Sequence, residues 1–173
     1  MRRPLSRRTV VWCVSLLFAL HNAEEAIAFR YYLPSVGSLL PAPFAAFAAR
    51  LSYPTLLVAL VVVTGLGVAV AAVAARHLES AGALWVLLVL EATLALNAIA
   101  HLASALLVFE GYGPGLLTAA LVNIPFAVYC FRRAAREGWV SPAALRATLP
   151  AAIVLHGPVL LGGLWLASAV GRR

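Results

Sequence analysis

Apolar residues fill five long segments of the chain, near residues 9–29, 55–76, 83–109, 112–132 and 150–170. Each segment has about 20 residues or more, the length that an α-helix needs to cross the hydrocarbon core of a bilayer. The pattern therefore predicts an all-α fold, a polytopic bundle of about five transmembrane helices. We expect residues 1–173 to form a single integral membrane domain.

The stretch between the first two spans, residues 31–54, has no long apolar run and is rich in proline, alanine and aromatic residues. This composition predicts an interfacial loop, with a short amphipathic helix at 42–50. After the third span, the run Glu-Gly-Tyr-Gly-Pro-Gly at 110–115 predicts a tight turn, because glycine and proline favour turn conformations.

The composition supports a membrane protein and excludes several other classes. Hydrophobic residues make up 64% of the chain and charged residues 11%, whereas a soluble domain has about 25% charged residues. The mean hydropathy is +0.97. The basic residues cluster at the ends of the apolar runs, so no basic face is available for nucleic acid. Membrane lipids or a lipid-soluble small molecule are the expected partners.

Arginine positions predict the orientation in the cell membrane. With the N-terminus inside, the external segments hold four arginines, Arg30, Arg50, Arg172 and Arg173. The cytoplasmic segments then hold nine, which are Arg2, Arg3, Arg7, Arg8, Arg76, Arg132, Arg133, Arg136 and Arg146. Because basic residues favour the cytoplasmic side, we expect a cytoplasmic N-terminus and an external C-terminus.

The first span contains three ionisable residues within five positions, His21, Glu24 and Glu25. An acidic side chain at the centre of a membrane helix costs about 2.5–3.5 kcal/mol on insertion scales. The spacing i, i+3, i+4 places all three on one helix face. Such residues must be paired, hydrated or used to bind something, so they mark a candidate site.

Other spans carry polar residues that belong with this cluster. The third span has Asn97 and His101 on one face and also Glu91, the fourth has Thr118, and the fifth has His156 before a Gly-Pro pair. Counting about 1.5 Å per residue along each helix places the first-span cluster, Asn97, His101 and Thr118 in one layer of the membrane. Glu91 and His156 fall deeper and are expected to form a second layer.

Three short motifs resemble those of a known family. His21-Asn22-Ala23-Glu24-Glu25, Asn97 to His101, and Pro114 to Thr118 are similar to the HxxEE, NxxxH and PGxxT motifs of the HXXEE family of membrane proteins, in the same order. The likeness covers about residues 20–125. The family is uncharacterised, so the resemblance implies a shared membrane site without naming a reaction. It implicates His21, Glu24, Glu25, Asn97, His101, Pro114, Gly115 and Thr118.

We expect the site to be that of a membrane-embedded enzyme acting on a lipidic or isoprenoid-like substrate by acid/base or metal-assisted chemistry. The candidate catalytic residues are Glu24, Glu25, His21, His101 and Asn97, and those expected to orient the substrate are Thr118, Glu91 and His156. In the metal-assisted alternative, His21, Glu24, Glu25 and His101 supply ligands that suit zinc or iron. The motif is also similar to the inverted zinc-protease motif HxxEH, but Glu25 stands where the second histidine belongs.

Two other functions stay open from the sequence. Intramembrane glutamates and histidines form proton relays in transporters and channels, and Glu91 with His156 would extend such a relay towards the cytoplasm. Alternatively, the polar groups only specify helix packing in an accessory subunit. All the arginines lie at or beyond the ends of the spans, so the glutamates lack basic partners in the membrane, and this weighs against a purely structural role.

Overall fold

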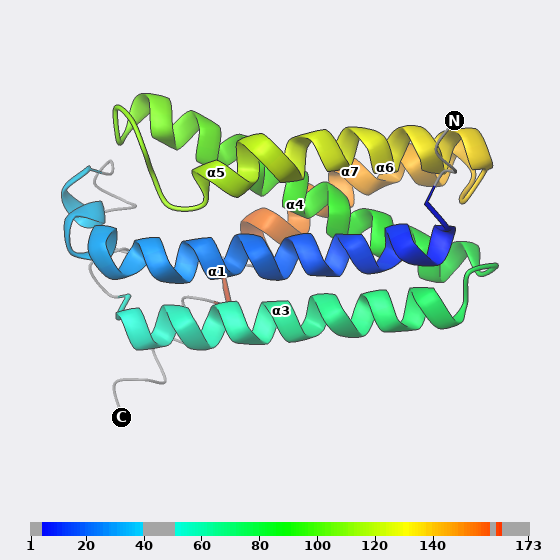
Figure 1. Ribbon diagram of the computed structural model, residues 1–173, viewed down its shortest axis with the longest axis horizontal. Coiled ribbons are helices and arrows are strands. Elements are labelled where there is room, and N and C mark those ends of the chain that lie inside the picture. The colour runs from blue at the N-terminus through cyan, green and yellow to red at the C-terminus, as the bar shows by residue number, and fades with distance from the viewer. Residues whose placement is uncertain (1–4, 40–50, 160–161, 164–173) are drawn as a thin grey trace.

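The computed structural model describes residues 5–39, 51–159 and 162–163, and within these ranges every regular element is a helix (Figure 1). Two of the segments, η1 and η2, are π-helical turns. The elements are α1 (Arg7–Leu39), α3 (Tyr53–Arg76), α4 (Ala81–Leu107), α5 (Leu116–Thr118), η1 (Ala119–Asn123), α6 (Ile124–Glu137), α7 (Pro142–Val154) and η2 (Leu155–Val159).

Four helices in the described part of the chain are long and apolar enough to cross a membrane. They cover Arg7–Leu33, Tyr53–Arg76, Ala81–Leu107 and Leu116–Glu137, the last of which runs through α5, η1 and α6. These helices match the first four predicted spans and confirm the all-helical membrane fold class. The predicted fifth span, 150–170, begins within α7, which starts at Pro142, and it continues through η2 to Val159. Beyond Val159, only residues 162–163 of this span are among the described residues.

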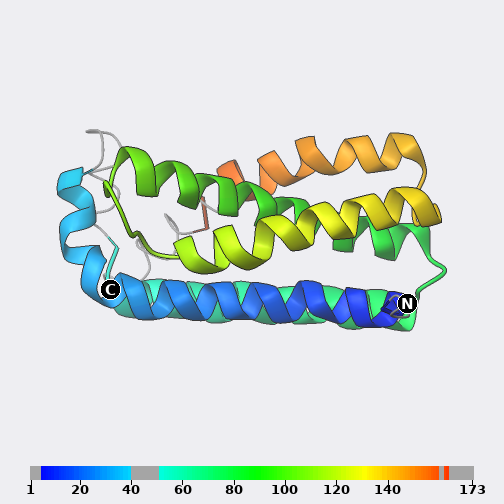
Figure 2. The same cartoon turned by 45° about the horizontal axis from the view of Figure 1, so that its top comes forward.

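Two predicted boundaries differ from the structure. Residues 31–39 were expected in an interfacial loop, but α1 continues through them to Leu39 and passes Pro34. A proline inside a helix removes one backbone hydrogen bond and bends the helix without always ending it, and the last turns of α1 change direction in Figure 2. Residues 112–115 were expected in the fourth span and instead form a loop before α5. The predicted amphipathic helix at 42–50 lies outside the described residues.

Serine residues mark where three of the helices begin. The hydroxyl oxygens of Ser52, Ser80 and Ser141 accept hydrogen bonds from backbone N–H groups three residues later, at 3.2, 3.3 and 3.2 Å. Each serine thereby satisfies one of the donors that a helix leaves free at its start. The helices α1 and α3 lie side by side, and α4 packs against α7 and against η1 (Figures 1 and 2).

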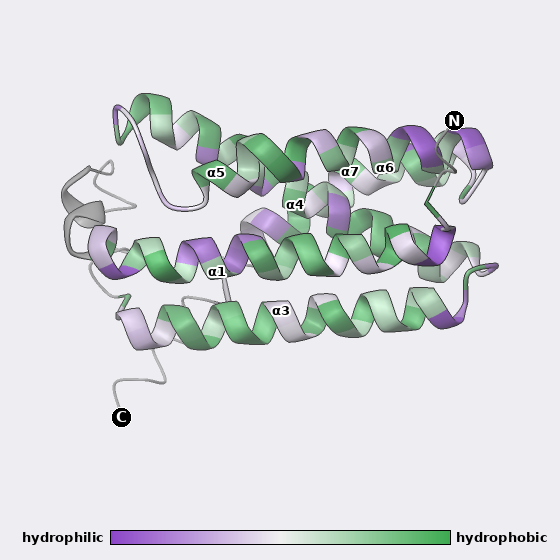
Figure 3. Cartoon of the chain, in the orientation of Figure 1, coloured by the Kyte–Doolittle hydropathy of each residue, from purple (hydrophilic) through white to green (hydrophobic). Residues whose placement is uncertain are grey.

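The two halves of the bundle differ in chemistry. An apolar core occupies the half near the N-terminus, and it is built by Val10, Val11, Val14, Ala71, Ala74, Ala75, Leu84, Leu87, Leu88, Cys130, Ala134, Trp139 and Val140. At this end Arg7 and Arg8 donate to the backbone oxygens of Leu78 and Ala75 at 3.0 and 3.1 Å. After an apolar stretch, α1 becomes hydrophilic again further along, as Figure 3 shows. The bundle therefore packs firmly at one end and places polar side chains in the other half.

Candidate functional site

His21 lies at the centre of a buried polar cluster between α1, α4 and α5. Its side chain is fully buried, with 0% exposure. The Nδ1 atom lies 2.7 Å from the hydroxyl oxygen of Thr118, and Asn97 Nδ2 donates to Nε2 at 2.7 Å. Both ring nitrogens therefore have partners from other helices, and they fix the orientation of the imidazole.

Asn97 connects three histidines. Its Nδ2 atom also lies 3.1 Å from Nε2 of His101, one helical turn further along α4. Its Oδ1 atom accepts a hydrogen bond of 2.9 Å from Nε2 of His156. The rings of His21 and His101 meet edge to face, with their centroids 4.9 Å apart. One amide thus holds groups from α1, α4 and η2 in a single network.

Glu25 brings a carboxylate to the two histidines. Its Oε1 atom lies 2.9 Å from Nε2 of His101 and 3.9 Å from Nε2 of His21. Glu25 is buried, with 8% exposure. One ligand atom from each of the three residues lies within 4.8 Å of the other two. Two imidazoles and one carboxylate at this spacing can hold a metal ion or exchange protons.

Glu24 has a different environment from its neighbour. Its Oε1 accepts hydrogen bonds from Leu117 N and the Tyr112 hydroxyl, both at 2.9 Å. Its Oε2 accepts from Thr118 N at 2.8 Å and from the Thr118 hydroxyl at 2.6 Å. The first N–H groups of a helix favour negative charge, so these four donors hold Glu24 as an ionised anchor for the chain leading into α5.

Gly115 allows the loop before α5 to approach the histidines. Its φ angle is +75°, in the left-handed region that favours glycine. A Cβ atom there would lie 2.8 Å from His21 Cε1 and 2.9 Å from His101 Cε1. The position therefore requires glycine for its backbone conformation and also for the space beside the site.

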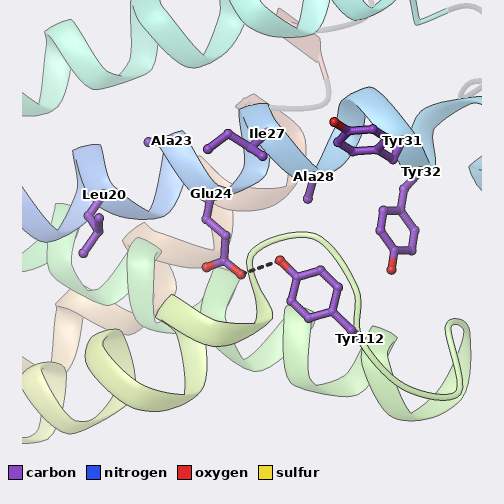
Figure 4. A pocket seen from close by; sticks show the side chains of 8 residues that line it. All are labelled: Leu20, Ala23, Glu24, Ile27, Ala28, Tyr31, Tyr32 and Tyr112. Carbon is purple, nitrogen blue, oxygen red and sulfur yellow. Dashed lines mark hydrogen bonds between the residues drawn. The ribbon is translucent and has the colours of Figure 1, made fainter.

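Tyr112 forms one wall of a surface cavity beside the cluster, and it was not singled out from the sequence. The cavity has a volume of about 380 Å³. Glu24 lies on its wall, and the Tyr112 hydroxyl donates a hydrogen bond to the Glu24 carboxylate (Figure 4). Burial and the Glu24 carboxylate raise the pKa of the Tyr112 phenol to about 12. The lining is otherwise mostly apolar, and it consists of Leu20, Ala23, Glu24, Ile27, Ala28, Tyr31, Tyr32 and Tyr112.

The structure brings together seven of the eight candidate residues, which are His21, Glu24, Glu25, Asn97, His101, Thr118 and His156. Glu91 and His156 were expected to form a second layer, and this prediction is wrong. His156, which lies in η2, instead forms a hydrogen bond with Asn97. Glu91 has 0% exposure, and neither carboxylate oxygen has a hydrogen-bond partner among the described residues. Asn123 is likewise buried, and its side-chain nitrogen and oxygen have no hydrogen-bond partner among the described residues.

Comparisons with known proteins give one finding. No curated protein and no solved structure matches the chain. One family model does match, over residues 12–130, and its description is "Protein of unknown function with HXXEE motif". The matched region is more than half of the chain and contains the three motifs whose residues form the cluster. The chain belongs to the HXXEE family.

Proposed function

We propose that the protein is a membrane-embedded enzyme that acts on a lipid-soluble small molecule. One observation carries this proposal: His21, Glu25, Asn97 and His101 converge from two helices into one buried network. Convergent titratable groups beside a mostly apolar cavity are typical of a reactive site. A network that served only packing would not need two histidines and a carboxylate at such short distances.

The residues have distinct roles in this proposal. His21, His101 and Glu25 are the reactive groups, because their nitrogen and oxygen atoms face one another. Glu24 is a positioning residue, since all four of its hydrogen bonds go to Tyr112 and the start of α5. Its ionised carboxylate holds Thr118, and Thr118 in turn orients His21.

The cavity beside Glu24 supports a lipidic substrate. Ile27 and Tyr31 on its rim are 68% and 72% exposed on a helix long enough to span a membrane. An apolar chain lying there would contact the tyrosine rings and aliphatic side chains, which bury apolar surface favourably. Glu24 lines this cavity and is linked to His21 through the Thr118 hydroxyl.

The proposed location is the cell membrane, with the N-terminus in the cytoplasm and the C-terminus outside. Arg7, Arg8 and the turn between α3 and α4 lie at the same end of the bundle, and basic residues favour the cytoplasmic face. Reporter fusions at both termini test this arrangement. The two termini reporting from the same side would contradict it.

Lipid extracts of cells that produce the protein test the enzymatic proposal. Wild-type protein and Glu79→Gln, which changes an exposed carboxylate in the α3–α4 turn, should alter the same lipid-soluble species. Glu25→Gln at equal abundance in the membrane should leave that species unchanged. Equal effects of Glu25→Gln and wild type would refute a chemical role for the cluster.

Glu91 favours a second candidate function, proton-coupled transport. Its carboxyl group is fully buried in α4 without a hydrogen-bond partner among the described residues, and such groups mark proton pathways in membrane proteins. Proton flux into liposomes would be measured for the wild type and for Glu91→Gln. Flux that disappears in Glu91→Gln supports transport, and no flux above that of empty liposomes contradicts it.

A further inference from the structure

The three reactive atoms of the cluster are arranged as ligands of one ion. One ligand atom from each of His21, His101 and Glu25 lies within 4.8 Å of the other two. Ligand atoms about 2.0–2.1 Å from a tetrahedral zinc ion are about 3.3 Å apart. The measured separations of 2.9 Å for His101–Glu25 and 3.9 Å for His21–Glu25 lie on either side of that value.

Hydrogen bonding directs the lone pair of His21 towards this centre. The Thr118 hydroxyl donates to the Glu24 carboxylate at 2.6 Å, so it has only lone pairs to offer His21 Nδ1 at 2.7 Å. Nδ1 must therefore carry the proton, and Nε2 of the neutral ring carries the lone pair. A histidine whose outer nitrogen donates to a chain that ends in a carboxylate is the usual support for a metal ligand.

The number of protons on the inner side of the cluster depends on what Asn97 donates to. Asn97 Nδ2 donates to Nε2 of His21 and lies 3.1 Å from Nε2 of His101. If it donates to both rings, no hydrogen remains between His101 Nε2 and Glu25 Oε1, two acceptors 2.9 Å apart. A cation between the three acceptor atoms would satisfy all of them at once.

The charges near the cluster also favour a cation. Glu25 is buried and Glu24 beside it is half-buried, and among the described residues neither forms an ion pair with an arginine. The arginine pairs there are formed by Arg7 and Arg133 with Glu79 and Glu137. A divalent ion would balance both carboxylates, and buried charges require such compensation.

We propose that His21, His101 and Glu25 bind one divalent transition-metal ion. Two histidines and one carboxylate form a ligand set found for zinc and for non-haem iron, and three protein ligands leave a position open for substrate or water. This proposal rests on the proposed enzymatic function, because it concerns the same site. It is tested by metal content rather than by activity.

Metal analysis of the detergent-purified full chain tests the proposal. After loading with Zn²⁺ and dialysis, the wild type should retain one zinc ion per chain. His77→Ala and Glu79→Gln, which change an exposed histidine and an exposed glutamate, should retain the same amount. Glu25→Gln and His101→Asn should retain little, and Thr118→Val should bind about 10–100-fold more weakly. Wild type without zinc, or Glu25→Gln with as much as His77→Ala, would overturn the proposal.

A second measurement covers variants that fail to fold. Wild-type protein loaded with Co²⁺ should show the visible absorption of a four- or five-coordinate ion with nitrogen and oxygen ligands, and Zn²⁺ should displace it. A cobalt spectrum equal to that of hydrated Co²⁺ would refute the site without any variant. Metal bound at one ion per chain with no change in lipid extracts would instead support the metal site and reject the enzymatic function.

Discussion

Replacing Glu24 by glutamine separates the anchoring role of this residue from the chemistry of its neighbour. The carboxylate accepts four hydrogen bonds, two on each oxygen, from Tyr112, Leu117 and Thr118. A glutamine NH₂ group cannot accept, so at least one backbone N–H at the start of α5 loses its partner. The hydroxyls of Tyr112 and Thr118 can rotate, which limits the loss.

The expected cost follows from these contacts. A fully buried donor left without a partner costs about 1–3 kcal/mol, and the remaining bonds weaken because a neutral acceptor replaces a charged one. Leu117 N is exposed and Thr118 N is part-buried, so we expect Glu24→Gln to lower the free energy of unfolding by about 1–2 kcal/mol. From the sequence alone, the opposite is expected: Glu24 has no arginine partner in the membrane, so removing its charge should stabilise the bundle. The four hydrogen bonds that Glu24 accepts in the structure reverse this expectation.

Unfolding in mixed micelles of increasing SDS fraction measures this difference. Glu25→Gln is the matched control, because it makes the same chemical change one residue away, where the helix donors do not reach. Glu25→Gln should change the unfolding free energy less than Glu24→Gln and should lose zinc more completely. A Glu24→Gln protein as stable as wild type would refute the anchoring role.

Three further predictions follow from the same contacts. Gly115→Ala should lower thermal stability and zinc retention more than Gly138→Ala, because both have positive φ but only the former places a Cβ against His21 and His101; equal melting-temperature losses and unchanged zinc would contradict this. Glu91→Leu should raise the free energy of unfolding by about 1–3 kcal/mol, since it removes a buried group without partners among the described residues; destabilisation in SDS titration would show that Glu91 is paired. In a spectrophotometric titration, the wild type should show a phenol that ionises near pH 12, and Tyr112→Phe should lack this phenol. Because the folded-state pKa is raised, the stabilisation from Tyr112 is complete below the ordinary pKa of 10.0 and is lost as the pH rises through 12; a late phenol that persists in Tyr112→Phe would refute the assignment.

Helix type and span positions follow from the sequence because they depend on local properties. An apolar run of sufficient length must satisfy its backbone hydrogen bonds within a helix when it lies in lipid. The four helices of the described residues that are long enough to cross a membrane therefore match the first four predicted segments. The sequence spacing also identified His21, Asn97 and His101 as polar groups on helix faces. The sequence pattern predicted that the first helix ends before residue 31, whereas α1 continues past Pro34 to Leu39.

The division of labour between Glu24 and Glu25 was decided only by the tertiary structure. Adjacent residues on a helix point about 100° apart, so the two carboxylates meet different partners. Glu25 reaches His101, whereas Glu24 reaches the first residues of α5, more than ninety positions away in the chain. Spacing within α1 cannot reveal this choice, because it depends on how α4 and α5 pack against α1. The position of His156 beside Asn97 is likewise a result of helix packing.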